Sequence, residues 1–139
     1  MNKIGVIGLG YVGLPLGLQF ARKGVQVLGL DVDTTKVDAI NSRKSYIKHI
    51  PSEDIAEVVD SKKFAASTDF SKVRELDAVL ICVPTPLDQH REPDLSYVLK
   101  SGEAIAPYLS PIDGQPKKLV VLESTTYPGT TDTDLKQVL

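Results

Sequence analysis

KIGVIGLGYVGLPLG, residues 3–17, contains the clearest indication of the fold. Its first part, residues 3–9, is a β-branched apolar run stopped by glycine, which is typical of a strand buried on both faces of a parallel sheet. Apolar residues continue from Val12 to Lys23-Gly24, where a helix closed by a glycine is expected. Between strand and helix lies the pattern G-x-G-x-x-G, formed by Gly8, Gly10 and Gly13. This order of strand, turn and helix predicts a dinucleotide-binding unit.

The chemistry of such a turn explains its glycines. Gly8 permits a tight turn, Gly10 lets a pyrophosphate approach the backbone, and Gly13 allows the helix to pack closely on the strand. The helix N-terminus adds free N–H groups and a partial positive charge. The alternative is that the glycines serve turn geometry alone.

An acidic residue follows at the expected distance. Asp31 ends the next predicted strand, 23 positions after Gly8, where a carboxylate can bind the adenosine ribose hydroxyls. A carboxylate there would repel a 2′-phosphate, so the sequence favours NAD over NADP, although Lys36 leaves some tolerance for NADP. The alternative is that Asp31 only caps a helix.

Further along the chain, predicted strands and helices alternate. Twenty or so residues, 43–63, interrupt the alternation with only a short helix after Pro51-Ser52, and so long a connection is usually functional or disordered. A helix at 34–42 is expected to be capped by Thr34 or Thr35, and a later helix by Asp94. The alternation predicts a single-domain α/β fold, a Rossmann-type doubly wound parallel sheet. Its further strands are expected at 25–31, 64–68, 77–83 and 118–124.

The end of the sequence, GTTDTDLKQVL (129–139), begins like a helix and stops at Leu139 without a C-terminal signal. We therefore expect residues 1–139 to be one NAD-binding domain, a fragment of a longer protein.

Composition narrows the function classes. The formal net charge is -2, with no basic run suited to a phosphate backbone, so we expect no nucleic-acid partner. Neither a membrane span nor a cleavable signal is apparent, so we expect a cytoplasmic protein. One cysteine and two isolated histidines, His49 and His90, give no metal-ligand spacing, and no metal site is predicted.

Two loops that follow predicted strands should face the same crevice as the glycine turn. In the first, Pro84 and Pro86 restrict the backbone around Thr85, whose hydroxyl would meet either the cofactor or only water. In the second, residues 123–131, a run of hydroxyls could hold a water or a ribose, or merely cap a helix. Cys82 stands in an apolar strand, where we expect a buried thiol that behaves as a small hydrophobe.

Taken together, GLGYVGLPLG, DVDTTKVDAIN, CVPTP and ESTTYPGTT resemble the N-terminal NAD-binding domain of the UDP-glucose/GDP-mannose dehydrogenase family over essentially all 139 residues. SYIKHI (45–50), HREPDLS (90–96) and ESTTYPG most resemble the members of that family that are UDP-N-acetylglucosamine 6-dehydrogenases. The resemblance implies oxidation of a UDP-sugar C6 alcohol to a carboxylate in two NAD-dependent steps, through a thioester on a cysteine.

The resemblance also implies roles for particular residues. It makes Thr125 a catalytic residue that helps place a water, and it assigns NAD contacts to Tyr11, Val12, Asp31, Lys36, Thr85 and Thr125. The family's nucleophilic cysteine belongs to later domains, and Cys82 does not match its motif. The 139-residue chain is therefore expected to bind NAD without turning over UDP-sugars, and the full-length protein to form a homodimer or a larger oligomer. Residues 43–63 would lie toward the sugar nucleotide.

Two other interpretations stay open from the residues alone. A β-hydroxyacid-type dehydrogenase domain shares the glycine pattern, but usually has methionine where this chain has Val12 and lacks CVPTP. A stand-alone NAD-sensing regulatory module needs the glycine turn and Asp31, but has no use for a rigid Thr85 or the hydroxyl run around Thr125.

Overall fold

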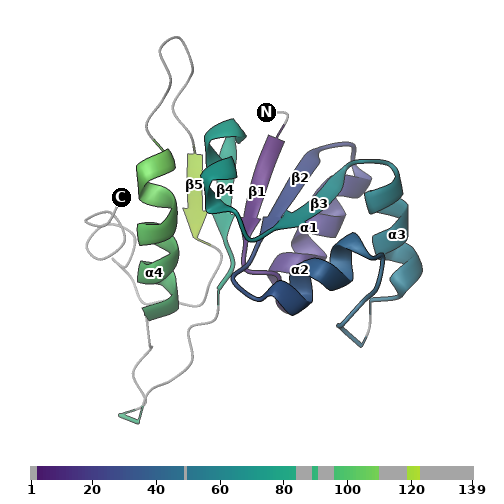
Figure 1. The fold of residues 1–139 in the computed structure, drawn as a ribbon, viewed down its shortest axis with the longest axis horizontal. Helices are drawn as coiled ribbons and strands as arrows, with labels where there is room; N and C mark the ends of the chain where they lie inside the picture. The colour runs from purple at the N-terminus through teal and green to yellow at the C-terminus, as the bar shows by residue number, and fades with distance from the viewer. Residues whose placement is uncertain (1–2, 49, 84–88, 91–95, 110–118, 123–139) are drawn as a thin grey trace.

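The computed structural model of the chain describes residues 3–48, 50–83, 89–90, 96–109 and 119–122. A five-stranded sheet forms the centre of these residues, and every neighbouring pair of strands is parallel (Figure 1). The strand order is β3-β2-β1-β4-β5, so the chain moves outward from β1 in one direction and then returns to build the other half. The predicted doubly wound Rossmann-type sheet is confirmed. Its strands are β1 (Lys3–Ile7), β2 (Gln26–Leu30), β3 (Phe64–Ser67), β4 (Ala78–Ile81) and β5 (Leu119–Leu122).

One face of the sheet is covered by three helices, α1 (Gly13–Arg22), α2 (Thr34–Asn41) and α3 (Ser52–Asp60). Buried residues of these helices pack with alternate residues of the strands into one core cluster. Leu14 of α1 and Ile55 of α3 are both fully buried there, and each such side chain stabilises the fold by about 1.5–3 kcal/mol relative to exposure.

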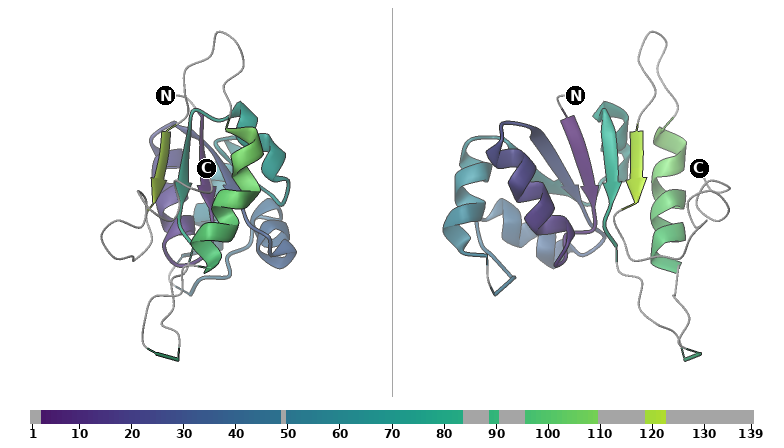
Figure 2. Two further views of the ribbon diagram at one scale, coloured as in Figure 1. Left: turned by 90° about the vertical axis from the view of Figure 1, so that its left-hand side faces the viewer. Right: turned by 180° about the vertical axis from the view of Figure 1, so that it is seen from behind.

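The opposite face carries a second, smaller core under α4 (Ser96–Ile105) and the 3₁₀ turns η1 (Phe70–Glu75) and η2 (Ala106–Tyr108). Figure 2 shows α1 and α4 on opposite sides of the sheet. In β4 the side chains alternate between the two cores, with Ala78 and Leu80 on one side and Val79 and Ile81 on the other. A strand buried on both faces needs this continuous apolar run, which is why the sequence identified it.

The structure confirms one predicted helix end and shows that another prediction was wrong. Gly24 has a φ of +90° and follows the last turn of α1, as the glycine stop predicted. The prediction of Thr34 or Thr35 as the cap of α2 is wrong, because Asp33 is the cap: its carboxylate accepts a hydrogen bond from the Thr35 N–H at 2.9 Å. Aspartate and threonine are both good caps, so a run of them leaves the position ambiguous. Asp94, the cap predicted for α4, lies outside the described residues.

Residues 43–63, the long connection expected from the sequence, contain a helix and a packed segment. The helix expected after Pro51-Ser52 is the nine-residue α3, which begins at Ser52 with Pro51 as its N-cap. Ile47, in the connection before it, is buried in the core cluster on the side of the sheet that carries α1, α2 and α3. The long connection is thus a packed segment and a helix, and it reaches the glycine turn. The helix expected at 129–139 lies outside the described residues.

Candidate functional site

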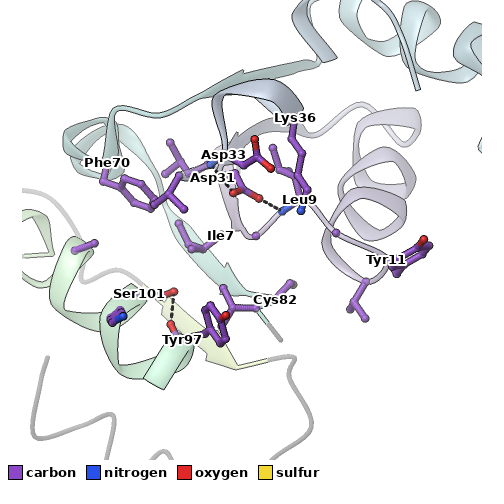
Figure 3. A pocket seen from close by; sticks show the side chains of 18 residues that line it. Ile7, Leu9, Tyr11, Asp31, Asp33, Lys36, Phe70, Cys82, Tyr97 and Ser101 are labelled. Atoms are coloured by element: carbon purple, nitrogen blue, oxygen red, sulfur yellow. Dashed lines mark hydrogen bonds between the residues drawn. The ribbon is translucent and has the colours of Figure 1, made fainter. Parts of the chain in front are cut away.

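A cleft of about 670 Å³ opens at the carboxyl ends of β1, β2 and β4. It lies where the strand order reverses between β1 and β4, which is the usual ligand site of an open parallel sheet. Most of its walls are formed by residues 7–12 at the glycine turn, residues 30–33 and Lys36 at and after the end of β2, and one face of α4. In Figure 3, Asp31 lies near the middle of the cleft, between Leu9 and Phe70, with Tyr97 and Ser101 on α4 across from them.

The three glycines of the turn differ in their surroundings. Gly8 has a φ of +94°, and a Cβ on it would come within 2.5 Å of the Cys82 carbonyl oxygen. A Cβ on Gly13 would lie 1.7 Å from the Gly8 carbonyl oxygen, so α1 packs directly on the turn. A Cβ on Gly10 would meet nothing within 4 Å. The first and third glycines are required by the fold, whereas Gly10 borders open space.

The helix that follows the turn leaves its positive end available. Val12 is the N-cap residue of α1 and makes no side-chain capping hydrogen bond, and the first turn contains no acidic residue. The partial positive charge of the helix N-terminus is therefore not neutralised by a side chain of the cap or first turn. Such an end suits an anion such as a phosphate.

Asp31 joins the turn to the end of β2. Its Oδ2 accepts a hydrogen bond from the Leu9 N–H at 2.8 Å, and its Oδ1 accepts one from the Asp33 N–H at 2.9 Å. The helix-cap interpretation of Asp31 is wrong, because Asp33 is the residue that caps α2. An ionised carboxylate offers about four acceptor positions, so two remain for a ligand.

The side chain, the N–H and the carbonyl oxygen of Leu9 are each held by a neighbouring residue. Its side chain is fully buried and packs on Gly29, where an added Cβ would come within 2.6 Å of Leu9 Cδ2. Its N–H donates to Asp31, and its carbonyl oxygen accepts a hydrogen bond from the Tyr46 hydroxyl. Burial, and then the negative charges of Asp31 and Asp33, raise the pKa of Tyr46 well above that of an ordinary tyrosine. The Tyr46 hydroxyl therefore keeps its proton and acts as a donor.

The wall opposite the turn is mostly apolar. Val32, 82% exposed, and Phe70 of η1 lie on one side, and the α4 face that contains Tyr97, Ser101 and Ala104 lies on the other. Asp69 caps η1 next to Phe70, and hydrogen bonds from the Ser71 hydroxyl and N–H hold the pKa of Asp69 below its usual value. This wall could cover a flat aromatic ring.

The structure brings most of the predicted site residues into one cleft. Its lining includes Gly8, Gly10, Tyr11, Val12, Asp31 and Lys36, and Gly13 lies directly behind the turn. Tyr11 and Val12 are 76% and 55% exposed, so their side chains are available to a ligand. Thr85 and Thr125 lie outside the described residues, and their roles stay predictions.

Cys82 is buried in the core, as the sequence predicted, with 6% of its surface exposed. It lines the base of the cleft, and its Cβ lies 3.2 Å from the position of a Cβ added to Gly13. A small side chain is needed there because the turn, α1 and β4 converge.

Sequence analysis missed Tyr46, Phe70 and the α4 face. Tyr46 meets Leu9 across 37 positions of the sequence, which no local pattern reveals. Phe70 lies in a 3₁₀ turn that is too short for a periodic signal. The α4 face did carry a signal, since Tyr97, Ser101 and Ala104 follow helical spacing, but no binding role was predicted for these three residues.

Two absences hold for the part of the chain that the structure describes. No three His, Cys, Asp or Glu side chains gather there in a way that could hold a metal ion. None of its helices combines the length and apolar character needed to cross a membrane.

Comparison with known proteins gives consistent matches. Residues 2–139 match the NAD binding domain of the UDP-glucose/GDP-mannose dehydrogenase family. UDP-N-acetyl-D-glucosamine 6-dehydrogenase of Pseudomonas aeruginosa is 33% identical over 137 residues, which cover 99% of this chain and 30% of that protein. UDP-N-acetyl-D-mannosamine dehydrogenase of Escherichia coli K12 is 41% identical over 133 residues, covering 93% of this chain and 29% of that protein.

Among solved structures, a ternary complex of GDP-mannose dehydrogenase from Pseudomonas aeruginosa superposes with a TM-score of 0.90 at 31% identity. The match covers 97% of this chain and 31% of that chain. This chain therefore spans about 30% of the length of the relatives it resembles.

Proposed function

Because this chain belongs to the UDP-glucose/GDP-mannose dehydrogenase family and forms its NAD-binding domain, we propose that the whole protein oxidises the C6 hydroxyl of a UDP-hexose to a carboxylate. Two successive hydride transfers to NAD convert one sugar and one water into the carboxylate, two NADH and three protons. The 139 residues supply the coenzyme half of the site. The family match supports neither of the two interpretations that the residues alone left open, the stand-alone NAD-sensing regulatory module and the β-hydroxyacid-type dehydrogenase domain.

The observation that carries the coenzyme assignment is the open space at Gly10 beside the uncapped N-terminus of α1. No steric clash within the fold requires a glycine at position 10. A glycine at such a position is explained when another molecule must approach the backbone closely. The pyrophosphate of NAD would bind here, where backbone N–H groups and the helix dipole attract negative charge.

The remaining parts of NAD have matching surfaces. Asp31 would accept hydrogen bonds from the adenosine ribose hydroxyls with the acceptor positions that Leu9 and Asp33 do not use. Val32 and Phe70 would cover the adenine ring, because both lie next to Asp31 on the apolar wall. Tyr11 and Val12 would contact the coenzyme from the turn itself.

The charges around the ribose position support NAD over NADP. Asp31 and Asp33 place two carboxylates where a 2′-phosphate would have to lie, and Lys36 supplies one opposing charge. Repulsion between like charges in a partly enclosed cleft should exceed the gain from one lysine.

For the sugar, we propose a UDP-hexose that carries an N-acetyl group, as the relatives' names suggest. The more specific prediction of UDP-N-acetylglucosamine rests on the resemblance of SYIKHI, HREPDLS and ESTTYPG. The glucosamine enzyme, whose match covers 99% of the chain, supports it, while the mannosamine enzyme has the higher identity. Thr85 is proposed to contact NAD, and Thr125 to contact NAD and help place a catalytic water. Buried Cys82 is not proposed as the nucleophile.

Coenzyme choice can be tested on the 139-residue chain by fluorescence titration with NADH and NADPH. We expect saturable binding of NADH and much weaker binding of NADPH. Asp31→Ala should weaken NADH binding and bring the two affinities closer together. Equal affinity of the unmodified chain for both coenzymes would contradict the role assigned to Asp31 and Asp33.

Substrate choice needs the full-length protein, with NADH formation followed by absorbance. UDP-N-acetylglucosamine, UDP-N-acetylmannosamine and UDP-glucose are compared, and the preferred sugar should yield two NADH per molecule. One NADH per sugar would contradict oxidation to the carboxylate. The 139-residue chain alone should give no NADH with any of them.

A further inference from the structure

We propose that Tyr46 is a positioning residue for the coenzyme, which holds the Leu9–Gly10 peptide group in the orientation that the pyrophosphate requires. The proposal rests on the proposed function, because it assigns Tyr46 a role in the same NAD site. Tyr46 does not line the cleft, so it would act through the turn and not by contact with the ligand.

The geometry of one peptide group carries the argument. The Tyr46 hydroxyl donates a hydrogen bond to the Leu9 carbonyl oxygen. A trans peptide group is planar, and its C=O and N–H point in opposite directions. Fixing the Leu9 C=O toward Tyr46 therefore directs the Gly10 N–H away from Tyr46, and Gly10 itself lines the cleft.

The turn needs such a restraint. Gly10 has no side chain to restrict its backbone, and glycine samples more conformations than any other residue. Asp31 fixes the peptide group before Leu9 through the Leu9 N–H at 2.8 Å, and Tyr46 fixes the one after it. The two hydrogen bonds together pre-organise the turn, which lowers the cost of ordering it around a ligand.

Tyr46 is itself held in place by its neighbours. The Ser45 hydroxyl donates to the Ile47 carbonyl at 2.9 Å, and the Ser52 hydroxyl at the start of α3 accepts from the Ser45 N–H at 3.1 Å. Ile47 is buried in the core next to the partly buried Tyr46 ring. The hydroxyl is thus fixed relative to the sheet, and its raised pKa keeps it a donor.

Tyr46→Phe removes the hydroxyl and keeps the ring, and Tyr108→Phe makes the same change in η2 outside the cleft. The affinity of the Tyr46→Phe chain for NADH should fall by up to about 10-fold, the worth of one hydrogen bond to a partly buried carbonyl. ADP-ribose should lose affinity in the same proportion. Adenosine lacks the pyrophosphate, so its affinity should be the same for the unmodified chain and the Tyr46→Phe chain. Tyr108→Phe should leave the affinities for NADH, ADP-ribose and adenosine unchanged.

A residue that only stabilised the fold would give a different pattern, with a lower melting temperature and either no change in affinity or an equal loss for adenosine and ADP-ribose. Either result would overturn the positioning role. If the unmodified chain binds NADH and the Tyr46→Phe chain binds it equally well, the positioning role fails and the proposed function stands. Absence of NADH binding by the unmodified chain would instead refute both.

A second measurement does not depend on the variant folding. In amide NMR spectra of the unmodified chain, the Gly10 resonance should shift strongly when ADP-ribose binds, because its N–H faces the pyrophosphate. The Gly24 resonance, from the far end of α1, should stay in place. A Gly10 resonance that does not move on saturation would overturn the proposed orientation.

Discussion

The carboxylate of Asp31 accepts a hydrogen bond from the Leu9 N–H at 2.8 Å, so the acid at the end of β2 also holds the glycine turn after β1. These residues lie 22 positions apart and meet because β1 and β2 are neighbouring parallel strands. A residue predicted to bind the coenzyme therefore also shapes the site before any coenzyme binds.

Asp31→Asn should separate this structural role from a simple loss of charge. Each carboxylate oxygen of Asp31 accepts a backbone hydrogen bond, from Leu9 and from Asp33, whereas asparagine has one acceptor oxygen and an NH₂ group that would face a second donor. We expect the free energy of unfolding to fall by about 1–3 kcal/mol, together with a loss of NADH affinity. Denaturant unfolding and NADH titration measure both.

The matched control for this change is Asp38→Asn on the exposed side of α2. It should alter neither stability nor affinity. An Asp31→Asn chain as stable as the unmodified one would show that the Leu9 hydrogen bond is unimportant for the turn.

Two alanine substitutions in the glycine turn should have different effects on stability and on NADH affinity. Gly10→Ala places its methyl group in open space, so the chain should keep its stability but lose NADH binding as the methyl blocks the pyrophosphate. Gly13→Ala drives a methyl group to within 1.7 Å of the Gly8 carbonyl oxygen and should cost about 3 kcal/mol or more. Thermal melts and NADH titration of both variants test this. NADH binding by the Gly10→Ala chain at full affinity would argue against a phosphate at that position.

Tyr46 should ionise at a higher pH than an unfolded tyrosine in an alkaline titration of the folded chain followed by ultraviolet absorbance. An unfolded tyrosine ionises near pH 10, and the folded pKa of Tyr46 is raised above that value by burial and by Asp31 and Asp33. Its contribution to stability is therefore complete below pH about 10 and is lost as the pH rises toward the folded pKa. The Tyr46→Phe chain should lose less stability in this alkaline range. Equal loss in both chains would mean that the Tyr46 hydroxyl is not shielded.

Cys82→Ser should change stability and not coenzyme affinity. A serine hydroxyl in this buried position costs about 1–3 kcal/mol if it is not fully hydrogen-bonded, whereas the small side chain still fits against Gly13. Reaction of Cys82 with an aromatic disulfide reagent should be slow, and slower with NADH bound. A large fall in NADH affinity of the serine variant would show that the thiol contacts the coenzyme directly.

The parts of the fold and site that were predicted from sequence have local causes. The glycine turn and Asp31 were identified because each lies at a fixed distance from a strand end, and Cys82 because its strand is apolar throughout. The cap of α2 was misplaced, since Asp33, Thr34 and Thr35 are all suitable caps and only the backbone geometry selects Asp33. Tyr46 reaches the glycine turn, and Phe70 reaches the cleft, through tertiary packing, which leaves no periodic trace in the sequence.

Calorimetric titration of the unmodified 139-residue chain with NADH tests whether this chain is an NAD-binding domain. We expect saturable binding at one site per chain, and loss of that binding in the Gly10→Ala chain at an unchanged melting temperature. The assignment of the NAD site would be wrong if the folded, unmodified chain gave no binding heat at any temperature, or if the Gly10→Ala chain bound NADH as well as the unmodified chain.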